Sequence, residues 1–143
     1  MAEIRFFHNA GDKFSAASHI IAAAYKKGRS VTIFAPRAED AAHIDGLLWN
    51  TPAHPFLPHV AAASPLAAET PVVIDPTLET PAHTDVLVNL AFDPPPGFER
   101  FAQVIEIVTQ DASDKNAARL RWQHYRKLGF KLESNDLART EPP

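Results

Sequence analysis

The residues best suited to chemistry form a basic segment near the end of the chain. Six of its side chains are basic and none is acidic, although the whole chain has 14 Lys and Arg against 17 Asp and Glu. The remaining residues therefore hold 8 basic against 17 acidic side chains, so the positive charge is a local feature. Such a patch attracts an anionic partner. The six basic residues are Lys115, Arg119, Arg121, Arg126, Lys127 and Lys131.

Helical geometry places part of this charge on one face. At about 100° per residue, Lys115, Arg119 and Arg126 fall within about 40° of one another, and Trp122 lies at their border. Guanidinium groups hold carboxylates through paired hydrogen bonds, and an aromatic edge can form the wall of a pocket. The face therefore suits an acidic chain that ends in an apolar group. The alternative is a solvated helix face with a half-buried Trp.

The neighbouring face of the same predicted helix is mostly apolar and is expected to pack on a sheet. Ala118, Tyr125 and Leu128 lie on it. Arg121 falls on this face too, and we expect its guanidinium group to extend towards solvent at the edge.

Other kinds of site have weaker support. The chain has no Cys, which excludes disulfides, thiolate metal sites and cysteine nucleophiles. The best metal candidates, His54 and His59 with Asp75 and His83, lack the spacing of a specific metal motif. No two glycines lie close enough to form a phosphate-binding loop. Gly11 to Lys13 is the only segment that resembles part of such a loop, and a helix N-cap at Asp12 is the simpler interpretation of it.

The elements that position these residues indicate an α/β fold. Apolar runs at 4–7, 30–35, 72–74, 86–90 and 104–108 predict strands. Helical spacing predicts helices that start near Asp12 and Pro36 and a last helix over 114–128. This order predicts one domain over residues 1–132, with a largely parallel sheet and helices on both faces.

Two regions are expected to lack regular structure. Seven of the thirteen prolines fall between Thr51 and Pro81, where we expect a long, packed, irregular connection. Residues 133–143 are polar and are expected to form a flexible tail. No apolar run approaches the roughly 18 residues of a membrane span, and the N-terminus is unlike a signal peptide, so we expect a cytoplasmic protein.

Four segments, in the same order, resemble a known family. The run from Leu48 to His59 reads L-W-N-T-P-A-H-P-F-L-P-H and resembles the L-W-x-x-P-x-x-x-F-x-P-H segment of the chi subunit of the bacterial DNA polymerase III holoenzyme. Segments 86–90, 95–101 and 118–130 agree as well. The resemblance implies a nucleotide-binding-like fold without its phosphate loop and a non-catalytic replication accessory protein. It implies no cofactor.

The resemblance also implies partners. Chi joins the clamp-loader assembly through a small subunit, psi, and binds the acidic C-terminal tail of single-stranded DNA-binding protein, which ends in Pro-Phe. Carried over to this sequence, the tail site has Lys115 and Arg119 as cations and Trp122 as an aromatic wall, where the family can carry Tyr. An aromatic residue of the proline-rich loop lines the same pocket. Gln123 stands where a Lys can occur in the family, and Arg126 or Lys127 could compensate for the missing charge. These residues are Lys115, Arg119, Trp122, Gln123, Arg126 and Phe56.

Two rival functions stay open from the residues alone. A basic stripe with an aromatic can bind single-stranded nucleic acid directly, although the acidic remainder of the chain opposes strong binding. The second rival function is that of a small-molecule or metal-dependent enzyme that uses the His-rich proline segment.

Overall fold

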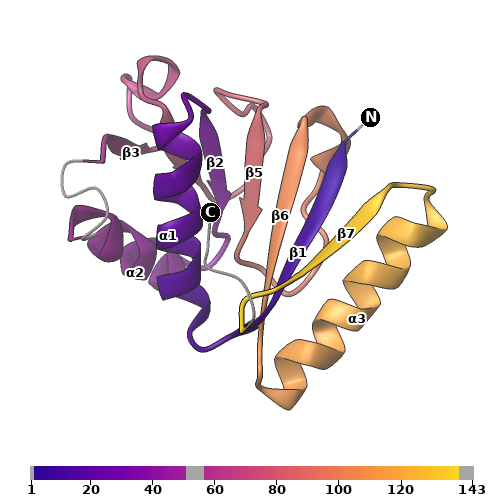
Figure 1. Ribbon diagram of the computed structural model, residues 1–143. Helices are drawn as coiled ribbons and strands as arrows, with labels where there is room; N and C mark the ends of the chain where they lie inside the picture. The colour runs from indigo at the N-terminus through magenta and orange to yellow at the C-terminus, as the bar shows by residue number, and fades with distance from the viewer. Residues whose placement is uncertain (1, 51–56, 139–143) are drawn as a thin grey trace.

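The structure, a computed structural model, describes residues 2–50 and 57–138 and forms one α/β domain (Figure 1). Its sheet has seven strands in the order β3-β4-β2-β5-β6-β1-β7, and every strand pair is parallel. The predicted largely parallel sheet is thus confirmed. The strands are β1 (Glu3–Ala10), β2 (Val31–Phe34), β3 (His59–Ala61), β4 (Val72–Asp75), β5 (Val86–Asn89), β6 (Gln103–Thr109) and β7 (Leu132–Asp136).

Helices cover both faces of this sheet, as the sequence predicted. Helices α1 (Lys13–Lys26) and α2 (Ala38–Trp49) lie on one face, and α3 (Ala112–Lys127) lies on the other, over β6, β1 and β7 (Figure 1). Two short 3-10 helices, η1 (Ala67–Glu69) and η2 (Phe98–Arg100), lie in the connections. Two separate apolar cores result. Ile21 and Ile44 belong to the first, and Phe6 and Tyr125 belong to the second.

Two of the three α-helices in the described residues begin at an aspartate cap, and the sequence predicted the first of these caps. The carboxylate of Asp12 accepts from the backbone N–H of Ser15, so the N-cap interpretation of Asp12 is confirmed. Asp111 does the same for α3 through the N–H of Asp114. Such caps satisfy backbone donors that the first helical turn leaves free.

The segment 51–81 is more regular than expected where the structure describes it. Residues His59–Ala61 form β3, which pairs with β4 at the edge of the sheet. Three residues between prolines give too short an apolar pattern for a strand to be predicted, so the partner strand decides the conformation.

The predicted flexible tail is wrong at its start. Residues 133–136 belong to β7, which pairs in parallel with β1 from Ile4↔Leu132 to His8↔Asp136. The segment is polar because an edge strand has one side open to solvent, and the prediction followed composition rather than pairing. The backbone of β1 orders these residues.

Candidate functional site

A cleft of about 390 Å³ lies between α3 and the strands beneath it, and we call it the α3–β1 cleft. Its volume is within the range typical of small-ligand sites. Four of its lining residues come from α3, three from β1, two from β6 and one from β7. They are Lys115, Ala118, Arg119 and Trp122; Phe6, His8 and Asn9; Val108 and Thr109; and Ser134.

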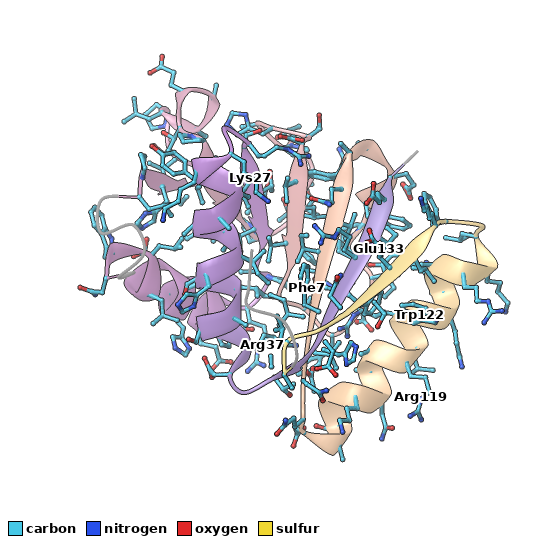
Figure 2. All side chains as sticks on the ribbon, viewed as in Figure 1. Phe7, Lys27, Arg37, Arg119, Trp122 and Glu133 are labelled. Atoms are coloured by element: carbon cyan, nitrogen blue, oxygen red, sulfur yellow. The ribbon has the colours of Figure 1, made fainter. Side chains whose placement is uncertain are left out.

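One wall of this cleft combines cations with an aromatic ring. Lys115 and Arg119 are exposed and lie one helical turn apart. Trp122 follows Arg119 about one turn later on α3 (Figure 2). The ring of Trp122 is half-buried and meets Phe6 edge-on, with centroids 5.1 Å apart. That contact fixes the indole at the cleft wall, since edge-to-face aromatic packing is directional. The cleft therefore offers two positive charges above an apolar floor.

An ion pair fixes the first turn of α3. Nζ of Lys13 lies 2.8 Å from Oδ1 of Asp114, and Oδ2 accepts from the backbone N–H and the hydroxyl of Thr109. Burial disfavours ionisation of Asp114, but these hydrogen bonds hold its pKa below the usual value. α1 follows β1, and α3 follows the adjacent strand β6 on the opposite face of the sheet. The ion pair between Lys13 and Asp114 therefore lies in the crevice between the ends of these two strands, where doubly wound sheets commonly bind ligands.

A buried polar network fixes the middle of α3. Arg121 is 1% exposed, and its Nε donates to Oε1 of Glu106 over 2.9 Å. Tyr125 donates its hydroxyl to Oε2 of Glu106 over 2.6 Å, and the amide of Asn89 donates to both oxygens. Burial raises the pKa of Glu106 against the opposing effect of Arg121, and burial beside Glu106 raises the pKa of Tyr125.

The network corrects one expectation. The guanidinium group of Arg121 does not extend to solvent; it points inward, because β6 supplies a buried carboxylate opposite it. A charge on the apolar face of a helix is stable in the interior only with such a partner. Arg121 therefore anchors α3 to the sheet.

The predicted site residues fall into three groups. Lys115, Arg119 and Trp122 come together in the α3–β1 cleft. Gln123 and Arg126 are exposed on α3 but line a different surface depression, with Leu120, His124 and Lys127. Phe56 lies outside the described residues. The structure thus brings half of the predicted set to one place.

Several lining residues were not predicted from the sequence. Phe6 and His8 are two residues apart on β1, so they share one side of the strand. That alternation was a usable signal, although the sequence alone did not show which side α3 covers. Ser134 is aligned with Phe6 across β1 and β7, and it was missed because β7 was missed.

The histidines of the proposed metal cluster have other partners where they are described. Nε2 of His59 lies 3.1 Å from a carboxylate oxygen of Asp45, and His83 donates to a backbone carbonyl oxygen. Asp75 accepts from two backbone N–H groups of the following turn. His54 is outside the described residues. Within residues 2–50 and 57–138, no group of three or more His, Cys, Asp or Glu is arranged to hold a metal ion.

The topology and the site define a Rossmann-like α/β protein with a cationic cleft beside its last helix. Comparison with protein families makes this class more specific. The family model described as DNA polymerase III chi subunit, HolC, matches residues 1–133. The chain therefore belongs to the DNA polymerase III chi subunit family and to the accessory proteins of DNA replication.

Curated relatives carry the same name. The DNA polymerase III subunit chi of Escherichia coli is 30% identical over 116 residues, which cover 80% of this chain and 79% of that protein. The protein of that name from Pseudomonas aeruginosa is 29% identical over 116 residues, covering 81% and 80%. The Haemophilus influenzae protein is 27% identical over 122 residues, covering 85% of each. The described part of this chain contains no helix with the length and apolar character that crossing a bilayer requires.

Proposed function

We propose that the protein links the clamp-loader assembly of DNA polymerase III to single-stranded DNA-binding protein by binding the acidic C-terminal tail of the latter. The observation that carries this proposal is the convergence of Lys115, Arg119 and Trp122 on the α3–β1 cleft. The cleft matches a peptide with negative charges followed by an apolar end. In this role the protein acts without catalysis, in the cytoplasm, and psi connects it to the clamp loader where psi is present.

The tail has a defined orientation in this proposal. Its terminal Phe side chain enters beside Trp122 and over Val108, while Arg119 binds the α-carboxylate through charge-assisted hydrogen bonds. Lys115, one turn nearer the start of α3, attracts the acidic residues upstream of the terminal Phe. Phe56 has no part in this orientation, because its neighbour Leu57 packs in the core beneath α1 and α2, away from α3. Gln123 and Arg126 contact only a longer peptide, because they lie outside the cleft.

The affinity is expected to be modest. A short peptide buries little area and loses conformational freedom, so binding in the micromolar range, about −8 kcal/mol, is expected. Weak binding is sufficient for tethering, because a polymerase held near coated single strands gains from effective concentration.

Calorimetric titration tests the proposal. An acidic peptide ending in Asp-Ile-Pro-Phe should bind at micromolar concentration, more weakly at higher salt, and the same peptide with an amidated C-terminus should bind at least tenfold more weakly. Arg119→Ala should abolish binding, and Arg126→Ala, which removes an exposed cation of the same helix outside the cleft, should change it little.

Two results contradict the proposal. One is equal loss of binding in both variants, which points to general charge attraction rather than to the cleft. The other is binding of a single-stranded oligonucleotide with higher affinity than the acidic peptide, which favours direct nucleic-acid binding.

A further inference from the structure

A second cleft, of about 420 Å³, lies on the other flank of the buried face of α3, between the helix and the connection from β5 to β6. We call it the α3–loop cleft. Its walls are mostly apolar: Phe92 and Pro94 come from the connection, and Ala117 and Leu120 come from α3. Phe92 and Leu120 are exposed, at 53% and 68%. Neither the proposed tail site nor the resemblance assigns a role to this surface.

The buried polar group in the lining of the α3–loop cleft is the guanidinium of Arg121. Its Nε donates to Glu106, and its Nη1 donates to the backbone oxygen of Phe92 over 2.9 Å. Its Nη2 is buried and has no hydrogen-bond partner among the described residues. Buried donors of charged groups are nearly always paired, because an unpaired one loses its hydration without compensation. The lining of this cleft therefore includes a side chain with an unused donor.

The surroundings restrict the charge of a ligand. Glu106 already neutralises much of the positive charge of Arg121, and Asp93 lies in the lining of the cleft. The carboxylates of Glu106 and Asp93 repel a dianion such as phosphate. A ligand with one carboxylate has a smaller charge and needs only one free donor. His124, also in the lining, supplies a second nitrogen. The apolar walls favour a carboxylate attached to an apolar group.

We propose that the α3–loop cleft is a second binding site, for a carboxylate attached to an aromatic or aliphatic group, with Arg121 as its anchor. Such a group is found in a small carboxylic acid and at the C-terminus of a peptide with an apolar last residue. The site is separate from the α3–β1 cleft, because the two share no lining residue.

Amide NMR titration of the uniformly labelled full chain tests this proposal. The probes are N-acetyl-phenylalanine, which mimics a peptide C-terminus, 3-phenylpropionate, which is a simple acid, N-acetyl-phenylalaninamide and inorganic phosphate. Either acid should shift the amide signals of the cleft lining, with a dissociation constant on the order of 1 mM for a ligand of this size. The signals are those of Phe92, Asp93, Ala117, Leu120, Arg121 and His124. The amide and phosphate should leave those signals unchanged.

Two exposed leucines of α3 provide a matched pair of variants. Leu120→Glu places a negative charge in the cleft lining and should weaken binding of the acid at least fivefold. Leu128→Glu places the same charge at a residue that is 51% exposed and outside the lining, and it should have little effect. Arg119→Ala disables the proposed tail site and should leave the new site intact.

The outcomes separate the possibilities. Binding of both acids indicates a small-molecule ligand, and binding of N-acetyl-phenylalanine alone indicates a peptide C-terminus; each supports the site. The proposal is overturned if the acids shift only residues of the α3–β1 cleft and Arg119→Ala removes those shifts. It is also overturned if the amide binds as well as the acid, if phosphate binds in preference, or if no probe shifts the signals of the α3–loop cleft.

Discussion

Nε of Arg121 lies 2.9 Å from Oε1 of Glu106, where both side chains are almost completely removed from solvent. Arg119, two residues earlier on the same helix, is exposed at the α3–β1 cleft. One arginine thus holds the helix on the sheet while the other is free to bind a partner.

Loss of the buried carboxylate should be strongly destabilising. Glu106→Gln leaves the charge of Arg121 buried without its counter-ion, so the free energy of unfolding should fall by about 3–5 kcal/mol. Urea denaturation followed by circular dichroism measures this change. Arg126→Met, an exposed change on the same helix, is the control and should stay within about 0.5 kcal/mol. Equal effects of the two changes would refute the anchoring role of the pair.

The ion pair between Lys13 and Asp114 should make stability depend on acid pH. The pKa of Asp114 in the folded protein lies below its ordinary value of 3.8, so the ionised form favours folding above that value. This contribution is lost as the pH falls through the folded-state pKa.

Asp114→Asn should therefore reduce the free energy of unfolding most near neutral pH, and the difference from the unsubstituted protein should shrink below about pH 3.8. Denaturation curves at several pH values provide the measurement. Asp93→Asn, at an exposed carboxylate, serves as the control. A difference that is independent of pH would contradict the assigned ion pair.

Peptide binding should be reported by one tryptophan and not by the other. Trp122 lines the α3–β1 cleft, whereas Trp49 is 62% exposed at the end of α2. Its ring centroid lies 4.9 Å from that of His59 in β3, at the opposite edge of the sheet. In a Trp49→Phe variant the acidic peptide should change the emission of Trp122. In a Trp122→Phe variant the emission of Trp49 should stay constant. A change in the emission of Trp49, with constant emission of Trp122, would indicate that the peptide binds at the other edge of the sheet.

Lysine charges on α3 should contribute unequally to peptide affinity. Lys115→Ala removes a charge that lines the cleft and should weaken binding by about twofold to fivefold at low salt, with a smaller effect at high salt. Lys127→Ala removes an exposed charge outside the cleft and should change affinity less than twofold. Titrations at two salt concentrations distinguish the two lysines.

Gly97 should tolerate substitution less well than Gly129. Both have positive φ, at 66° and 86°, a backbone conformation that disfavours side chains. A Cβ on Gly97 would meet Nη2 of Arg100 at 2.5 Å, and that nitrogen donates to the backbone oxygen of Leu78. A Cβ on Gly129 meets no atom within 4 Å.

Gly129→Ala should therefore cost about 1–2 kcal/mol for backbone strain alone, and Gly97→Ala should cost more because the hydrogen bond of Arg100 is also disturbed. Thermal unfolding of the two variants compares them directly. A smaller loss for Gly97→Ala would show that Arg100 moves without cost.

The central strands and the cationic face of α3 could be predicted from the sequence because each has a local pattern. Apolar runs such as 86–90 reflect burial on both sides of a parallel strand. Lys115, Arg119 and Trp122 lie on one helical stripe, and helical periodicity is enough to bring them together. These predictions needed no knowledge of tertiary pairing.

The inward orientation of Arg121 and the existence of β7 depend on distant partners. The carboxylate partner of Arg121 is Glu106, an acid inside an otherwise apolar run, and that exception is a sequence sign of a buried ion pair. Strand β7 forms because β1 pairs with it, although the two segments are at opposite ends of the chain. Local composition carries no information about such pairing.

The position of β1 has a consequence for synthesis of the protein. Its two neighbours in the sheet are β6 and β7, which are translated about a hundred residues later. Until the ribosome has made residue 136, β1 lacks at least one neighbour and keeps an unpaired edge. We therefore expect the nascent chain to complete this sheet only after β7 has been made, so that a chain interrupted before β7 is prone to aggregation.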